Sequence, residues 1–248
     1  PAGPEVTDPV YTPVTLDADR YISLEDNVSL PLIYMLWPTV YANHPDEAPL
    51  DVLNSIMGDG KTSLLYKNLE KEGLAVNAVA GHGCRELSCQ FTLYALPNPA
   101  KGTSLADLES AMRNSLKEFE ARGAQADDID RVKAGIVSGM IYGLESVSGK
   151  VSQLAAYETY RNTPDGIMDD IRRYENVTAA DVMRVYNQYI KGKHAVIMSI
   201  VPKGQGDKIA APDTWSRYER DIPVDTDTSE FNWTLPEDDF DRSVYPGA

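Results

Sequence analysis

Positions 55–62 carry the sequence SIMGDGKT, which has nearly the residue types and spacing of a loop that binds phosphate. The first position of that motif, where a glycine allows a tight turn, is Ser55. A phosphate loop also follows a strand, so that its amides and the N-terminus of the next helix converge on the anion. Residues 50–57 have the apolar period of a helix instead. A nucleotide-binding domain is therefore kept only as a remote alternative.

Three side chains that could bind a metal lie close together in the sequence, namely His82, Cys84 and Cys89. A structural zinc site takes four protein ligands, and no fourth group with zinc-site spacing follows these three. The pattern favours an ordinary hairpin histidine. We therefore predict no metal site in this chain.

The two cysteines flank residues 85–88 and could face each other across a hairpin, where opposed strand residues come close enough for a disulfide. The alternative is two reduced, partly buried thiols. A disulfide between Cys84 and Cys89 would imply an oxidising compartment such as the periplasm, whereas reduced thiols would fit the cytoplasm.

The composition argues against two classes of partner. With 38 acidic and 23 basic residues among 248, the formal net charge is −15, and the basic residues do not form the cluster that nucleic acid requires. The longest apolar runs, near 30–38 and 195–202, are far too short to span a bilayer. We expect neither nucleic-acid binding nor a membrane span. If the partner is a peptide, the acidic balance weakly favours basic ones, but the solubility of the tail explains the same charge equally well.

Apolar periodicity and turn residues divide the chain into a linker at 1–20, a folded domain at 21–202 and an acidic tail at 203–248, which we expect to pack on the surface through aromatic residues. Strands are predicted at 21–24, 30–36, 75–81, 87–96 and 194–201. Helices are predicted at 50–57, 64–73, 104–123, 127–144, 151–160, 165–174 and 178–192. This order predicts an α+β fold, an antiparallel sheet with helices packed on one face.

Two of these helices have a further signature. Ser104 with Asp107, and Thr178 with Asp181, have the spacing of a capping box at a helix start.

The helix at 127–144 carries glycines at 135, 139 and 143, each costing about 1 kcal/mol relative to alanine. This spacing predicts that another backbone packs closely against them.

Four segments together resemble the M16 zinc metallopeptidases, the insulinase, pitrilysin and mitochondrial-processing-peptidase-like family. They are LPLIYMLWPTV, LDVLNSIMGDGKTSLLYKNLEKEGLAV, the strand that ends in FTLYALPNP, and DDIDRVKAGIVSGMIYGL. The resemblance covers about residues 20–202. It is to the inactive, C-terminal-type half of the bacterial members.

The resemblance implies paired, similarly folded halves that enclose a chamber, with the zinc motif H-x-x-E-H in one half only. There zinc polarises the scissile carbonyl and activates water, and the glutamate takes the proton. The nearest match in this sequence is His44-Pro45-Asp46-Glu47-Ala48, in which the second histidine is Ala48 and offers no lone pair. We therefore predict no catalytic residue and no metal ligand here, and we expect zinc in the partner half.

In this family the inactive half often holds the substrate backbone with an arginine and a tyrosine. The positions that match them are Glu70 and Val76, so the resemblance implies that both roles are missing. The glycine turn leaves four candidates for residues that face the chamber: Gly60, Lys61, Ser63 and Tyr66. An ordinary connection between two helices explains the same residues equally well.

The leading hypothesis is a non-catalytic M16 half that forms part of a peptide-binding chamber and supports proteolysis by a zinc-bearing half, in the same polypeptide or in a separate subunit. The alternative is a structural or assembly subunit of the same fold that has lost proteolysis. Whether the adjoining half carries an intact H-x-x-E-H would distinguish the two.

Overall fold

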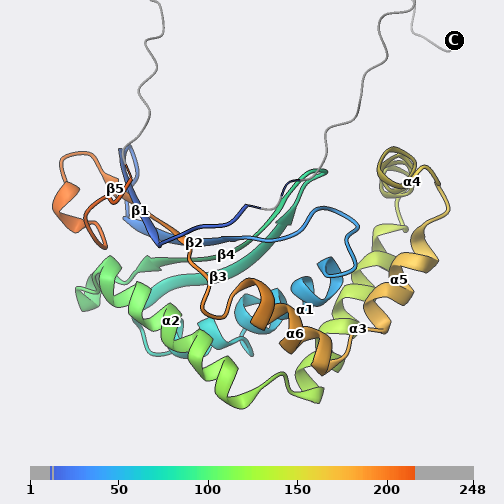
Figure 1. Cartoon of the computed structure of the whole chain (residues 1–248), viewed down its shortest axis with the longest axis horizontal. Coiled ribbons are helices and arrows are strands. Elements are labelled where there is room, and N and C mark those ends of the chain that lie inside the picture. Colours follow the sequence, from blue (N-terminus) through green and yellow to red (C-terminus); the bar gives the residue numbers. More distant parts are fainter. Residues whose placement is uncertain (1–11, 13, 216–248) are drawn as a thin grey trace, which may run out of the picture. The chain divides into compact units, whose positions relative to one another are not determined.

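The computed structural model describes residue 12 and residues 14–215, which are built around a five-stranded sheet (Figure 1). The strands are β1 (Arg20–Asp26), β2 (Leu32–Pro38), β3 (Ala75–Cys84), β4 (Cys89–Pro97) and β5 (Val196–Pro202). Their order in the sheet is β1-β5-β2-β4-β3. The predicted α+β class is confirmed.

The sheet is mixed rather than wholly antiparallel, because β1 and β5 run parallel while every other neighbouring pair is antiparallel. The last strand enters the sheet between β1 and β2, which run in opposite directions. A strand in that position must be parallel to one of its two neighbours. The sequence pattern gives strand positions but not the order in which strands pair, so it could not reveal this.

The described residues also form six α-helices and three shorter helical segments. They are α1 (Glu47–Gly58), α2 (Leu105–Arg122), α3 (Ala126–Gly143), α4 (Val147–Arg161), α5 (Ile167–Glu175), α6 (Ala179–Tyr189), η1 (Tyr66–Glu70), η2 (Pro99–Lys101) and η3 (Gly206–Lys208). Both predicted capping boxes are present, at the start of α2 and of α6. No helix in the described part of the chain is long and apolar enough to cross a membrane.

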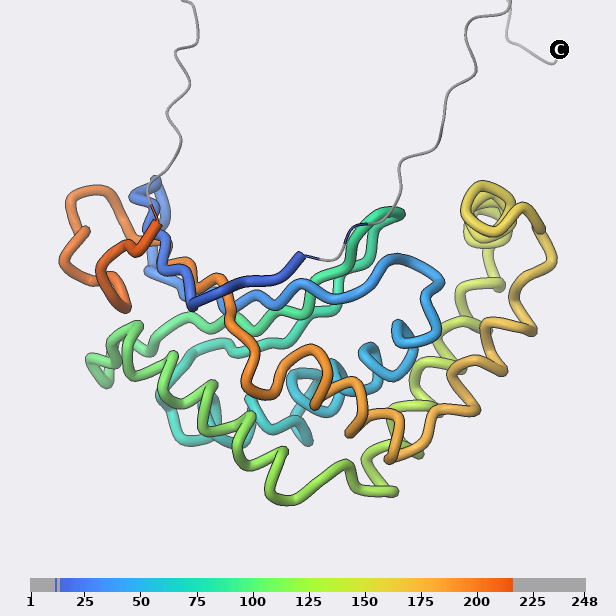
Figure 2. The backbone as a smooth tube through the Cα atoms, viewed as in Figure 1, coloured from blue at the N-terminus to red at the C-terminus, as the bar shows by residue number. Residues whose placement is uncertain are grey.

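The helices cover one face of the sheet, and the core lies between the two layers (Figure 2). Side chains along β2 alternate accordingly, with Ile33, Met35 and Trp37 buried against the helices. The main contacts to the sheet come from α1, which packs on β3, and α2, which packs on β2 and β4.

The opposite face of the sheet has no helix over it within the described residues (Figure 1). A row of side chains in register crosses all five strands on this face, and each is partly exposed: Ile22, Met198, Tyr34, Tyr94 and Val79. Open sheet faces normally carry polar residues in alternation with the buried ones. We refer to this row as the open-face row.

The folded region continues beyond β5. The backbone N–H of Gly204 donates to Glu25, and that of Ala210 donates to the Ser199 hydroxyl, 3.0 Å away. Further on, Thr214 pairs with the backbone of Tyr21. Residues 204–214 therefore pack against β1 and β5, while the rest of the expected tail lies outside the described residues, as do positions 1–11 and 13 of the expected N-terminal linker.

The three glycines of α3 face open space, at positions 135, 139 and 143. Outside their own helix, no described atom would lie within 4 Å of a Cβ added at any of them. The predicted close approach of another backbone is therefore wrong for the described residues, because α3 packs on its neighbours through its other face. The glycine that does allow close packing is Gly58, where an added Cβ would lie 2.0 Å from the backbone nitrogen of Ala80.

Gly58 and Gly135 form a matched pair for a stability test. We expect Gly58→Ala to lower the free energy of unfolding by about 2–4 kcal/mol, because the methyl group would meet the backbone of β3. We expect Gly135→Ala to raise it by up to about 1 kcal/mol, since alanine is the better helix former and nothing obstructs it. Denaturant unfolding measures both, and shifts of the same sign would contradict this account.

Candidate functional site

The incomplete zinc motif lies where the chain enters α1, and its acidic residues are held by other side chains. Glu47 forms an ion pair with Arg173 at 2.7 Å and accepts the backbone N–H of Asn43 at 2.8 Å. Ala48, at the position of the missing histidine, is fully buried in the core. Glu47 therefore links the start of α1 to α5, and the contacts of its carboxylate are with a guanidinium group and a backbone N–H.

Asp46 and His44, in the same segment, also have partners within the fold. Asp46 pairs with Arg184 and accepts the hydroxyl of Tyr189, each at 2.7 Å. The Nδ1 atom of His44 accepts the backbone N–H of Asp46 at 3.0 Å, and its ring packs edge-on against Tyr41. Segment 44–48 is thus a structural junction between α1, α5 and α6, and these residues do not fit the catalytic zinc of an H-x-x-E-H site.

The chamber candidates lie in the turn between α1 and η1. Ser63 is buried, where its hydroxyl donates to the carbonyl of Gly60 at 2.8 Å and accepts the N–H of Tyr66 at 3.3 Å. Ser63 is therefore a helix cap and does not present its side chain to open space. Lys61 is exposed and Tyr66 is partly buried. Because α1 precedes this turn, the segment also lacks the strand that a phosphate loop needs.

Glu70 and Val76, at the positions where the family often has its arginine and tyrosine, have different surroundings. The Glu70 carboxylate accepts the backbone N–H of Ala78 at 2.8 Å, on the edge strand β3. It thereby satisfies a donor that would otherwise be free to pair with an added strand. Val76 is half exposed on the same strand and offers no hydrogen-bonding side chain.

A second polar cluster is centred on Asp51, in α1. One carboxylate oxygen is 2.6 Å from Nδ1 of His82, and the other accepts the hydroxyl of Tyr174 at 2.6 Å. The opposite ring nitrogen of His82, Nε2, lies 3.2 Å from the Thr39 hydroxyl. Burial, followed by the nearby Asp51 charge, raises the pKa of Tyr174 well above its ordinary value.

The two cysteines lie beside this cluster. The structure joins Cys84, the last residue of β3, to Cys89, the first of β4, in a disulfide at the end of the hairpin. The sulfur of Cys84 is 3.9 Å from both ring nitrogens of His82. The side chain of His82 is completely buried, which its hairpin position in the sequence did not indicate.

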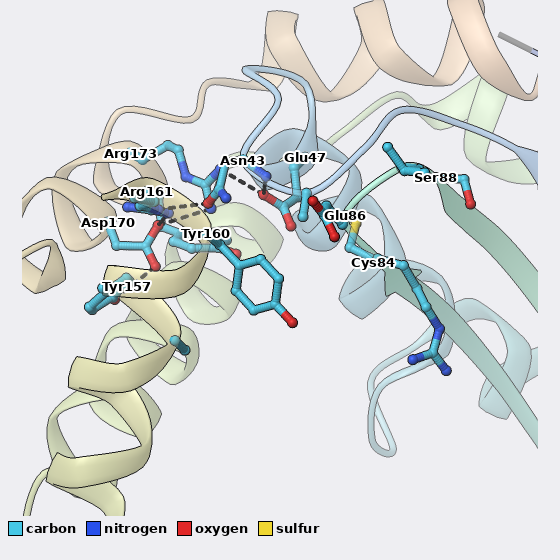
Figure 3. Close-up of a pocket in the computed structure, with 15 residues that line it drawn as sticks. Asn43, Glu47, Cys84, Glu86, Ser88, Tyr157, Tyr160, Arg161, Asp170 and Arg173 are labelled. Atoms are coloured by element: carbon cyan, nitrogen blue, oxygen red, sulfur yellow. Dashed lines mark hydrogen bonds and ion pairs between the residues drawn. The ribbon is translucent and has the colours of Figure 1, made fainter. Parts of the chain in front are cut away.

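A pocket of about 590 Å³ opens between this hairpin and helices α4 and α5 (Figure 3). On the helical side, Asp170 forms ion pairs with Arg161 at 2.7 Å and Arg173 at 2.9 Å, and it accepts the Tyr157 hydroxyl. Cys84 and Glu86 lie across from these residues, with the ring of Tyr160 between the two walls (Figure 3).

Sequence reasoning missed the contribution of Asp51 and Tyr174, because they come from α1 and α5 and meet His82 only in the folded chain. A faint signal was available, since an aspartate lies in the apolar stretch that begins at Leu50. Within the described residues the geometry supplies ion pairs, hydrogen bonds and one cluster of metal-binding side chains, His82 with Cys84 and Cys89. An intact H-x-x-E-H arrangement is not among them.

The family comparison agrees with this geometry. Residues 1–136 match the model of the peptidase M16 inactive domain. The chain belongs to the M16 peptidase family. Within it, the chain is a domain of the inactive, C-terminal type, which is consistent with the structural use of segment 44–48.

Three relatives of this M16 domain are longer than the chain itself. It is 28% identical over 180 residues to the zinc protease PqqE of Helicobacter pylori, an alignment that covers 72% of this chain and 40% of the relative. Among solved structures, a protease from Helicobacter pylori has a TM-score of 0.71 at 22% identity and covers 81% of this chain and 48% of its own. The M16 inactive domain from Pseudomonas fluorescens has a TM-score of 0.65 at 20% identity, with coverages of 81% and 47%. The chain therefore spans less than half the length of each of these proteins.

The ion pairs of segment 44–48 make a testable claim about stability. We expect Arg173→Met to lower the free energy of unfolding by about 2–4 kcal/mol, because Glu47 and Asp170 would lose their partner at a site where all three side chains are at most 22% exposed. Arg172→Met is the control, since the Arg172–Asp169 pair is 63% and 74% exposed, and should change stability by less than about 0.5 kcal/mol. Chemical denaturation compares them, and equal effects would show that segment 44–48 is not held by these pairs.

Proposed function

We propose that this M16 domain acts as the non-catalytic half of a zinc metallopeptidase, together with a half that carries H-x-x-E-H. The two halves enclose a chamber for peptides, and the chemistry belongs to the zinc-bearing half. The observation that carries this proposal is the open-face row, a band of partly exposed apolar residues in a domain that spans less than half the length of the two Helicobacter pylori proteins it resembles.

Without a covering layer, this face exposes apolar surface to water. The open-face row has Ile22 and Met198 beside Tyr34 and Tyr94, whose rings are 5.2 Å apart, so apolar surface is continuous across the strands. Contiguous apolar patches of this kind mark interaction sites. The open face of such a sheet is normally polar, so a row of apolar side chains there favours a covering surface.

The occupant that we assign to this face is the zinc-bearing half, in the same polypeptide or as a separate subunit. Peptide is the substrate class that follows from the family, and the net charge of −15 favours basic peptides through electrostatic attraction. The domain contributes wall and closure surface rather than reacting groups, because Glu70 covers an edge strand and Ser63 is buried in a turn.

A periplasmic location belongs to the same proposal. It is supported by the pairing of Cys84 with Cys89, since disulfides persist in oxidising compartments and are rare in the cytosol.

The test is reconstitution with an M16 half that has an intact H-x-x-E-H and is encoded in the same polypeptide or beside it. We expect cleavage of a quenched fluorescent peptide rich in lysine and arginine only when both halves are present, and a chelator should abolish it. An acidic peptide of equal length should be cleaved more slowly. Chelator-sensitive cleavage by this chain alone would overturn the proposal, and a stable complex without cleavage would favour the structural or assembly role.

The face itself is tested by a pair of methionine substitutions. Met198→Glu places a charge in the open-face row, and we expect it to weaken association with the zinc-bearing half at least tenfold, because the carboxylate would be buried without a partner. Met168→Glu is the control, since Met168 on α5 is already 53% exposed. Sedimentation or titration calorimetry measures association, with thermal unfolding to confirm that both variants fold. Equal affinity of the two variants would place the interface elsewhere.

A further inference from the structure

We propose that His82, Cys84 and Cys89 form a zinc site when the disulfide is reduced, so that the end of the β3–β4 hairpin alternates between a covalent and a metal-bound state. The site is separate from segment 44–48 and from the zinc of the catalytic half. It belongs to this chain alone and does not depend on the proposed function.

The ligand atoms are already gathered. His82 and Cys84 are two residues apart on β3 and therefore share a face of the strand, and Cys89 is the direct partner of Cys84 on β4. The ligand atoms of the three residues all lie within 4.8 Å of one another. Two ligands of one tetrahedral zinc ion are separated by about 3.5–4 Å, given bonds of about 2.0 Å to nitrogen and 2.3 Å to sulfur. The 3.9 Å between the Cys84 sulfur and the His82 ring is within that range.

Asp51 prepares the histidine for this role. Zinc-binding histidines usually donate their second N–H to a carboxylate, which fixes the ring orientation and the tautomer. Here the Asp51 carboxylate is 2.6 Å from Nδ1, so it accepts that proton and leaves the lone pair on Nε2. The Thr39 hydroxyl, 3.2 Å from Nε2, is the contact that the metal would replace. Tyr174 holds the other carboxylate oxygen and keeps Asp51 in place.

The change of state is a balanced redox step. A dithiol reductant transfers two electrons and two protons to the Cys84–Cys89 bond, which gives two thiols and a disulfide on the reductant. Zinc then binds both sulfurs as thiolates, and two protons leave to solvent. A water molecule completes the fourth position, because the cluster supplies three ligands.

The ion and the reductant have a route to the sulfurs. Cys84 is partly exposed and lines the pocket of about 590 Å³ as well as a second pocket of about 450 Å³ on the other side of the hairpin. Cys89 is 4% exposed and His82 has a buried side chain, so the metal would lie just inside the surface with Cys84 as the outermost ligand.

The experiment measures zinc bound to the whole chain after dialysis, with and without a non-chelating phosphine reductant. We expect close to one zinc per reduced chain and less than one tenth of that in the oxidised chain. Cobalt in place of zinc should give a sulfur-to-metal charge-transfer band in the near ultraviolet. Asp51→Asn should weaken zinc binding 10–100-fold without removing a ligand. Two titratable thiols and no bound zinc in the reduced chain would overturn the proposal.

Reduction could also loosen the hairpin, so a variant that needs no reductant is decisive. Cys84→His cannot form the disulfide but keeps three ligands, at a partly exposed position that accommodates the larger ring. We expect it to retain zinc in air, whereas Cys84→Ala, the matched control, should retain less than one tenth as much. Circular dichroism establishes that both variants are folded. Equal zinc contents in the two folded variants would show that this cluster is not a metal site.

Discussion

The carboxylate of Asp51 is the interaction on which the arrangement of this half of the molecule depends. It lies in α1 and is hydrogen-bonded to His82 of β3 and Tyr174 of α5, so one side chain joins three elements that are far apart in the sequence. The side chain of His82 is fully buried, so removing Asp51 would leave a buried polar group without this partner. Helices α1 and α5 and strand β3 must therefore be placed so that Asp51, Tyr174 and His82 can all form these hydrogen bonds.

The ion pairs at the start of α1 extend the same constraint. Glu47 and Asp46, one turn before Asp51, bind arginines of α5 and α6, so the end of the helix that resembles a catalytic motif is used for assembly of the fold. A metal ligand needs a free lone pair aimed at a shared point, and these carboxylates are aimed at guanidinium groups instead. Ala48, at the position of the second histidine, is fully buried and lets α1 pack directly against the core.

Local patterns predicted much of the fold. The capping boxes, the apolar periods and the hairpin turn each depend on residues within a few positions of one another, and each was recovered. Other features depend on the whole fold. The parallel pairing of β5 with β1 joins residues more than a hundred positions apart. The exposure of the α3 glycines and the burial of His82 depend on which face of an element packs against another. The candidate site divides in the same way: His82 and the cysteines are neighbours in the sequence, but Asp51 and Tyr174 join them only through the fold.

The position of the hairpin connects the two proposals. Its residues on one face meet Asp51 and the helices, while Val79 on the other face belongs to the open-face row that we assign to the zinc-bearing half. Both faces are carried by the same strands, β3 and β4, which the Cys84–Cys89 bond joins at their ends. Strand β3, which this bond joins to β4, is at one edge of the sheet and carries Val79 at one end of the open-face row. The two cysteines thus lie at the end of the strands that carry Tyr94 and Val79 of the open-face row.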